Sequence, residues 1–370
     1  MKSSQSWWRK SAKPLPVSRH SISEQDIEAV TRVLRSDSLT RGNETRAFEE
    51  EFAGYVGAGY AVACSSGTAA LWLAVHAAQG SQWQRWMVPA ITFAATRNAA
   101  RDFGPTHWIC DVNPKTGLLA DYPAAEVSQR GIPVLYAGQA ISESFAVNVY
   151  DACHALGSLY PNEDRVGSHN NPATCFSFHP SKTITTGEGG MVVTDDEGYA
   201  GELRRFRDNG IVRPMLPDVE PWWYDNSGYG LNFHMSDIAA ALGRSQLKRI
   251  DETLERRRAL AREYRRCLPG LAKPVIQSVD RNACHIFPVL IDFDGLGVTR
   301  AGVMQRLLSY WKIATQVHYI PLASLPGANE FYRRELTLPL HCEMNEHDVR
   351  DVCDALAASC IAYDPGAASA

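Results

Sequence analysis

Residues 176–190 read FSFHPSKTITTGEGG, and this stretch decides the fold of the chain. The apolar run before Ser181 is typical of a strand, and the glycines after Thr186 are typical of a tight turn. Lys182 lies between them. An amine attacks a carbonyl only when it is unprotonated, so a Schiff-base lysine needs burial or nearby positive charge to lower its pKa. Alone, Lys182 could also be an ordinary surface lysine before a turn, so its neighbours must decide.

Two upstream stretches supply those neighbours. Residues 146–150, AVNVY, read as a short strand that ends before Asp151, and ligands bind at the carboxyl ends of strands in open α/β sheets. Residues 60–64, YAVAC, read as a strand that runs into the turn at 65–71 and a helix to about Gln79. The free N–H groups at such a helix start favour a phosphate. A phosphate cradle, a carboxylate and a glycine-flanked lysine together predict pyridoxal phosphate (PLP), whose ring nitrogen the carboxylate keeps protonated.

The composition narrows the class of protein. With 370 residues and 45% hydrophobic content, the chain can bury one large core and a smaller second one. The net charge of −4 gives no electrostatic case for binding nucleic acid or an anionic membrane. No apolar run approaches the roughly 18 residues of a membrane helix, and residues 1–16 do not resemble a secretory signal. The nine cysteines are scattered without a C-x-x-C pair, which argues against disulfides and a zinc site and favours the cytoplasm.

Strands and helices alternate through the first half of the chain, which predicts an α/β fold with a largely parallel sheet. The expected strands are 60–64, 85–88, 106–110, 132–136, 146–150, 173–178 and 190–194. The expected helices are 23–36, 45–55, 67–79, 92–102, 196–209 and a long one at 236–267. Strands near 284–292, 313–318 and 335–338 and helices near 299–311 and 345–361 follow. We expect a flexible N-terminal segment (1–16), a large PLP-binding domain (17–250) and a small C-terminal α+β domain (251–370).

The order of these blocks resembles the DegT/DnrJ/EryC1/StrS sugar aminotransferases. The likeness extends from Ile22 to Val352. It is carried by residues 22–27, 39–42, 65–71, 89–96, 151–158, 176–190, 230–243 and 316–319. The resemblance implies the fold type I architecture of PLP enzymes, with a mostly parallel sheet of the seven-stranded type in a large domain and a small C-terminal α+β domain.

The resemblance also implies roles for individual residues around the cofactor. Lys182 would bind PLP covalently and then move a proton between substrate and cofactor. Asp151 would pair with the pyridinium nitrogen, His154 would lie near the phenolic oxygen, and Phe93 would stack on the ring. Without the resemblance, Phe93 and His154 could be ordinary core residues.

The phosphate and the substrate have their own expected partners. Gly67, Thr68 and Ser177 would hold the cofactor phosphate, although Ser177 could instead satisfy a buried backbone group. Asn232 would reach the phosphate of the neighbouring subunit, because the family builds its active site at a homodimer interface; Asn232 could also be a turn residue. His234, His318 and Tyr319 are the expected substrate residues.

Two features depart from the family pattern. Only residues 139–145 separate two strands that a parallel crossover usually joins with a dozen or more residues. A helix is therefore shortened or lost, and tryptophans near Trp83 and Trp86 or near Trp222 and Trp223 are the expected cover. The second departure is His234, where relatives carry an arginine that can clamp a carboxylate in a bidentate way.

The retained Lys182 favours transamination over the dehydration that a histidine-substituted branch of the family performs. Glutamate is the expected amino donor. Residues 151–158, 176–179 and 316–319 most resemble in sequence the 4-aminotransferase of the pseudaminic-acid pathway. That enzyme uses a UDP-linked 4-keto-6-deoxy-N-acetylhexosamine for flagellin glycan or surface polysaccharide. A dTDP- or GDP-linked 3- or 4-keto sugar, for lipopolysaccharide or secondary metabolites, is the alternative. A non-catalytic regulatory or binding relative is the alternative of another class.

Overall fold

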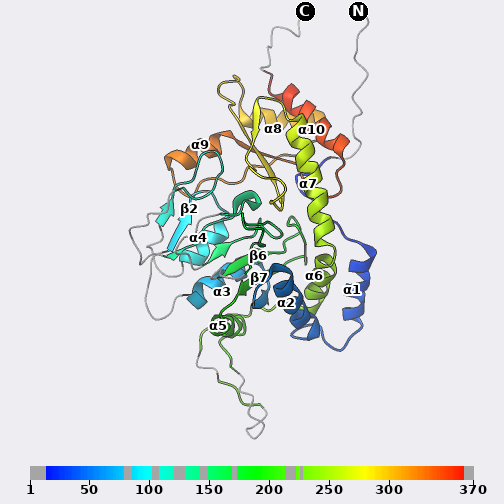
Figure 1. The fold of residues 1–370 in the computed structure, drawn as a ribbon, viewed down its shortest axis with the longest axis vertical. Helices are drawn as coiled ribbons and strands as arrows, with labels where there is room; N and C mark the ends of the chain where they lie inside the picture. Colours follow the sequence, from blue (N-terminus) through cyan, green and yellow to red (C-terminus); the bar gives the residue numbers. More distant parts are fainter. Residues whose placement is uncertain are drawn as a thin grey trace, which may run out of the picture.

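The structure of the protein is a computed structural model (Figure 1). It describes residues 14–78, 86–101, 108–120, 130–141, 149–168, 173–212, 222–225 and 228–361. Of the N-terminal segment expected to be flexible, residues 1–13 lie outside this part. Leu15 forms a parallel bridge with Ile313, and its N–H donates to the carbonyl of Lys312 at 2.8 Å. The chain is thus already part of the fold at residue 15.

Seven strands form the central sheet. In spatial order they are β3 (Trp108–Cys110), β2 (Trp86–Pro89), β4 (Arg130–Gly131), β5 (Tyr150–Asp151), β6 (Thr174–Ser177), β7 (Gly190–Thr194) and β1 (Tyr60–Cys64). A parallel bridge between Val134 and Asp151 joins the first three strands to the other four. β7 is antiparallel to β6 and β1, while the remaining pairs are parallel. The predicted fold class is confirmed.

Helices cover both faces of this sheet. The side chains of β1 point alternately to the two faces, and each set packs in a core with the helices on its side. Val62 and Cys64 pack with three helices, α3 (Gly67–Ala78), α4 (Ala94–Arg101) and α5 (Glu197–Arg207). Ala61 and Ala63 pack on the opposite face with α2 (Asn43–Val56) and α6 (Asp237–Leu247). Figure 1 shows β6 and β7 between these two groups of helices. α1 (Glu24–Leu34) packs outside α6.

The long helix expected at 236–267 is two helices, α6 and α7 (Ile250–Cys267). The break falls at Arg249, whose φ of −116° and ψ of 18° are not helical. Its guanidinium reaches back to the Asp26 carboxylate at 2.5 Å and to the carbonyl of Ser21 at 2.9 Å. These contacts connect sites more than two hundred residues apart, so local periodicity could not show them.

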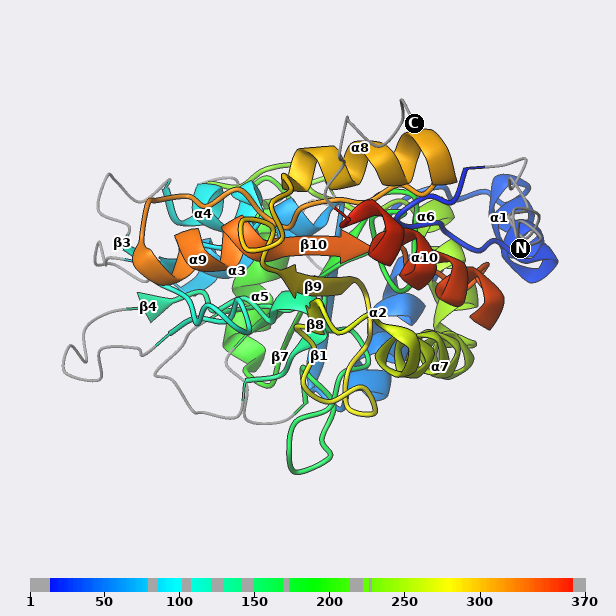
Figure 2. The ribbon, with the colours of Figure 1, turned by 90° about the horizontal axis from the view of Figure 1, so that it is seen from above.

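The C-terminal part has its own sheet, in the antiparallel order β10 (Glu335–Leu338), β9 (Phe287–Ile291) and β8 (Ala272–Pro274). Three further helices belong to it, α8 (Arg300–Trp311), α9 (Pro326–Arg334) and α10 (Glu346–Ser359). β8 and α9 were not predicted, and residues 313–318 form isolated bridges in place of the expected strand. Figure 2 shows the three strands side by side, with α8 and α10 next to β10.

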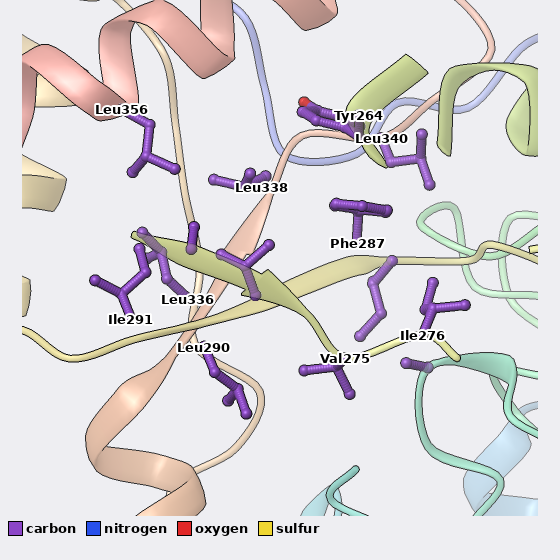
Figure 3. Packing of buried hydrophobic residues seen from close by; sticks show 14 of the residues in the cluster. Tyr264, Val275, Ile276, Phe287, Leu290, Ile291, Leu336, Leu338, Leu340 and Leu356 are labelled. Carbon is purple, nitrogen blue, oxygen red and sulfur yellow. The ribbon is translucent and has the colours of Figure 1, made fainter. Parts of the chain in front are cut away.

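The core of this part is apolar and closely packed (Figure 3). Tyr264 of α7 stacks on Phe287 of β9, with ring centroids 4.6 Å apart and an interplanar angle of 16°. The same core takes in Ile91, Val112 and Tyr136 from the first half of the chain. Residues that follow strands of the central sheet therefore pack into the core of the C-terminal part, while the strands themselves pack in two other clusters. None of the described helices is long and apolar enough to cross a membrane.

Among the residues that the structure describes, no tryptophan is found as the expected cover of the shortened crossover. Trp86 is a residue of β2 itself and is fully buried in its core, so it cannot cover the sheet from outside. Trp222 and Trp223 are 72% and 47% exposed. Trp83 lies outside the described residues, as do residues 142–148 of the crossover and its strand.

Candidate active site

A cavity of about 800 Å³ lies where the central sheet meets the C-terminal part. Its floor comes from the ends of β5 and β6 and the start of α3, and its opposite wall comes from residues 316–319. Nine of the predicted site residues line it: Gly67, Thr68, Phe93, Asp151, His154, Ser177, Lys182, His318 and Tyr319. Gly67 and Tyr319, which lie 252 positions apart in the chain, are thus brought to one site.

Lys182 follows β6 in a turn whose backbone is fixed by a hydrogen bond from its own N–H to the carbonyl of His179 at 2.8 Å. The side chain is half-buried and faces the cavity. Burial lowers the pKa of the amine, and the nearby Cys153 and Asp151 oppose this only in part. The site therefore shifts the amine toward the neutral, nucleophilic form that carbonyl attack requires.

Asp151 ends β5 and is almost fully buried, with 4% exposed. The Thr96 hydroxyl donates to its Oδ2 at 2.7 Å, and the N–H of Cys153 donates to its Oδ1 at 3.1 Å. Thr96 is in turn 2.7 Å from the hydroxyl of Thr92. A carboxylate held by two donors is fixed in direction while keeping further lone pairs for a protonated ring nitrogen in the cavity.

The start of α3, where the phosphate cradle was predicted, lines the cavity. The first N–H groups of a helix have no intrahelical partners, and the helix dipole favours an anion there. At Gly67 an added Cβ would stand 2.6 Å from the Cβ of Ser177, so only glycine allows this close approach. At Gly190 a Cβ would stand 2.3 Å from the carbonyl oxygen of Ser66, so β7 packs directly against the cradle. The N–H of Ala69 already donates to the Ser66 hydroxyl at 3.1 Å, so the N–H groups of Gly67 and Thr68, beside the hydroxyls of Thr68 and Ser177, are the donors that suit a phosphate.

His154 is buried and held from both sides. The N–H of Ala137 donates to its Nδ1 at 3.4 Å, and its Nε2 lies 3.0 Å from the hydroxyl of Tyr319. Burial, with the nearby Lys182, keeps the pKa of His154 well below its usual range, so the ring is neutral. Phe93 is 59% exposed at the cavity, with its ring centroid 6.0 Å from that of Tyr319.

Two predicted residues do not line the cavity of this chain. Asn232 is exposed and forms a bridge with Asp208. The Nε2 of His234 lies 3.1 Å from the Asp208 carboxylate, which also binds Arg41 at 2.8 Å. Burial lowers the pKa of His234. The Nε2 atom of His234 thus already contacts the Asp208 carboxylate, which is also paired with Arg41. It is therefore not available to an anionic group of the substrate.

Several residues at the site were not found from the sequence. Thr92 precedes α4 and Thr96 lies in its first turn, and their hydroxyls are 2.7 Å apart. His285 packs its ring 4.6 Å from His154. Glu335 and Thr337 alternate along β10, so their side chains share one face of the strand. Only the fold shows that these residues contact Asp151, His154 and His318, which line the cavity.

Comparison with known proteins agrees with this geometry. The sequence profile of the DegT/DnrJ/EryC1/StrS aminotransferase family matches residues 20–357. SpsC of Bacillus subtilis, a spore coat polysaccharide biosynthesis protein, is 33% identical over 376 residues, which cover 92% of this chain and 96% of SpsC. A UDP-4-amino-4,6-dideoxy-N-acetyl-beta-L-altrosamine transaminase of Campylobacter jejuni is 32% identical over 372 residues, with the same shares of each chain. The structure of Helicobacter pylori PseC, an aminotransferase of pseudaminic acid biosynthesis, superposes with a TM-score of 0.85 at 26% identity, covering 94% of this chain and 99% of PseC.

Fold and comparisons thus define a fold type I PLP enzyme, and its cavity brings together Lys182, Asp151 and the start of α3. The chain belongs to the DegT/DnrJ/EryC1/StrS aminotransferase family. The predicted family, reaction class and cofactor are confirmed: it is a PLP-dependent sugar aminotransferase.

Proposed function

We propose that the protein transfers an amino group from glutamate to the keto group of a nucleotide-linked sugar, with a UDP-linked 4-keto-6-deoxy-N-acetylhexosamine as the first candidate. The observation that carries this is Lys182, an amine with a lowered pKa in a cavity that also holds the Asp151 carboxylate. The transaminase of Campylobacter jejuni, named for a UDP-linked 4-amino sugar, and PseC support the choice of sugar. Surface polysaccharide or flagellin glycan synthesis is the setting this implies.

The residues of the chain divide the work. Asp151 would hold the ring nitrogen of PLP in its protonated form, the start of α3 with Thr68 and Ser177 would hold the phosphate, and Lys182 would be the point of covalent attachment. When bound, PLP supplies an electron sink for charge that develops at the carbon bearing the amine. Lys182, once released, is the group placed to carry a proton to and from that carbon.

The sugar nucleotide would enter on the other side, against residues 316–319. His318 and Tyr319 offer polar atoms there and Phe93 an exposed ring. We further propose that the working form is a homodimer in which the exposed Asn232 reaches the neighbouring subunit's cavity. Its absence from the cavity of its own chain supports this role.

The donor half of the reaction is tested by the visible spectrum of the PLP-loaded protein. Glutamate should abolish the visible band of the lysine-bound cofactor and produce the band of the aminated cofactor and free 2-oxoglutarate. Lys182→Ala should bind PLP without the lysine-linked band. A band that ignores glutamate would refute glutamate as the donor, and an unchanged spectrum in Lys182→Ala would refute the assignment of the lysine.

The acceptor half is tested with the aminated enzyme and defined ketosugars. The UDP-linked 4-keto sugar should regenerate the lysine-bound band and yield an amino sugar of the expected mass. A dTDP- or GDP-linked 3- or 4-keto sugar is the second candidate, because the structure of DesI with its TDP-sugar product is also similar, at 30% identity and a TM-score of 0.80. Turnover of only those sugars would favour the second candidate. No PLP binding at all would favour the non-catalytic alternative.

A further inference from the structure

A chain of hydrogen bonds runs behind His318, on the side away from the cavity. The Nδ1 of His318 lies 2.8 Å from the hydroxyl of Thr337, and that hydroxyl lies 2.6 Å from Oε1 of Glu335. The other carboxyl oxygen, Oε2, accepts the backbone N–H of His318 at 3.0 Å. Glu335 and Thr337 are fully buried. The outer nitrogen of His318, Nε2, has no protein partner among the described residues, and His318 lines the cavity.

One hydroxyl hydrogen links the two ends of this chain. If Glu335 is ionised, the Thr337 hydroxyl donates to Oε1 and accepts from an Nδ1–H, which leaves Nε2 bare. If Glu335 is protonated, its proton must sit on Oε1, because Oε2 already accepts a backbone N–H. The carboxyl group then donates to Thr337, Thr337 donates to Nδ1, and the ring hydrogen sits on Nε2. The two charge states of Glu335 thus select opposite tautomers of His318.

The surroundings of Glu335 decide which state prevails near neutral pH. Burial raises its pKa to about 8, against an ordinary value of 4.5. The nearby cation, Arg300 of α8, uses Nη1 on the backbone carbonyls of Tyr332 and Glu335, not on the carboxyl group. Tyr136 and Tyr319 also face Glu335, and negative charge on either would add to the repulsion.

His318 itself stays uncharged throughout. Burial and the nearby Lys182 lower its pKa to about 4. His154 and His285, the other rings of this cluster, have pKa values held well below the usual range by burial and by Lys182. Above about pH 4, a change at His318 is therefore a change of tautomer rather than of charge.

We propose that Glu335 is a positioning residue which, through Thr337, decides whether His318 offers the cavity a hydrogen-bond donor or an acceptor at Nε2. The protons balance: on ionisation the Nε2 proton leaves to the cavity solvent, the Thr337 hydroxyl proton passes to Nδ1, and the Glu335 proton passes to Thr337. This rests on the proposed function in one respect, that the sugar nucleotide contacts His318. With Glu335 protonated, Nε2–H would donate to an oxygen of the substrate.

The first test needs neither substrate nor activity. The protein is labelled with ¹⁵N-histidine, and the His318 resonances are assigned by their loss in His318→Gln. The nitrogen shifts should report hydrogen on Nε2 at about pH 6 and on Nδ1 at about pH 10, with a midpoint near the Glu335 pKa of about 8. One unchanging tautomer across this range would overturn the proposal.

Two variants separate the relay from a general pH effect. In Glu335→Gln the carboxamide NH₂ donates to Thr337 while its oxygen accepts the His318 N–H, so hydrogen should remain on Nε2 at every pH. Thr337→Val removes the connecting hydroxyl and should uncouple the tautomer from pH, whereas Thr337→Ser should restore the coupling. A tautomer change that persists in Glu335→Gln would overturn the role of the carboxyl group.

The consequence for the reaction should appear in the pH dependence of KM for the sugar nucleotide. The KM for the sugar nucleotide should rise as the pH passes about 8 in the wild type and stay flat in Glu335→Gln, while the glutamate half-reaction keeps its pH profile in both. An unaltered KM profile beside a confirmed tautomer change would refute the contact with the substrate. If the sugar is not a substrate at all, the proposed function fails while the tautomer result stands.

Discussion

The Nε2 atom of His154 lies 3.0 Å from the hydroxyl oxygen of Tyr319, joining the central sheet to the far wall of the cavity. Because the N–H of Ala137 donates to Nδ1 of His154, the ring hydrogen must sit on Nε2 and donate to Tyr319. The Tyr319 hydroxyl hydrogen is then free to point into the cavity. The resemblance implies that the phenolic oxygen of the cofactor lies near His154, and the Tyr319 hydroxyl is a second polar group beside that ring.

Replacing Tyr319 with phenylalanine should therefore reduce stability. The change leaves the buried Nε2–H of His154 without an acceptor, which typically costs about 1–3 kcal/mol of the free energy of unfolding. Urea unfolding of the two proteins measures the difference. Tyr310→Phe is the matched control, because Tyr310 is 74% exposed and should change stability little. Equal unfolding free energies for the two variants would contradict the role of the His154–Tyr319 bond.

Replacing Thr96 with valine should weaken PLP binding. Valine keeps the shape of the side chain but removes the hydroxyl that donates to Oδ2 of Asp151 at 2.7 Å. A hydrogen bond to a charged group contributes about 1.5–3 kcal/mol, so the Kd for PLP should rise by roughly 10- to 100-fold. Fluorescence titration of apoprotein with PLP measures this. Thr96→Ser should retain most of the affinity, and equal losses in both variants would point to packing instead.

Replacing Gly190 with alanine should damage the phosphate cradle. The added Cβ would stand 2.3 Å from the carbonyl oxygen of Ser66 and 2.9 Å from the backbone nitrogen of Gly67, and neither backbone atom can swing aside. We expect a loss of about 1–3 kcal/mol or more in stability, together with weaker phosphate binding. Gly201→Ala is the control.

Gly201 lies within α5 with no atom near its added Cβ, so alanine there should stabilise the helix by roughly 0.5–1 kcal/mol. Thermal unfolding of both variants gives the two signs. A neutral Gly190→Ala would show that β7 does not press on the cradle.

The buried Glu335 should also make stability depend on pH. Its pKa is about 8 in the folded protein and near 4.5 when exposed, so the folded state binds more protons between these values. Its contribution is therefore fully present below about 4.5, falls as the pH rises through this window and is lost above about 8. The difference in unfolding free energy between wild type and Glu335→Gln, measured at several pH values, isolates this effect. A difference that does not vary with pH would contradict the raised pKa.

Nine of the predicted site residues line one cavity, and they could be singled out because their sequence signals are local. Lys182 and Asp151 each lie in a short stretch with a strand on one side, and seven strands were expected close to their observed positions. Long-range contacts decide two of the features that were missed. The break at Arg249 depends on Asp26, and β8 exists only as an edge partner of β9. Thr96 and Glu335 have ordinary neighbours in sequence. Their proposed roles become visible only in the fold, where Thr96 contacts Asp151 and Glu335 contacts His318.

The shared core below the cavity also bears on how the chain is made. Phe287, Leu336 and Leu338 come late in the chain, yet they pack in one core with Ile91 and Tyr136 from its first half. During synthesis the early residues leave the ribosome well before their partners exist. A nascent chain that stops before β10 would expose this apolar surface and leave Gln316 without Thr337, its bridge partner, so the wall at residues 316–319 can be fixed in place only after β10 has emerged.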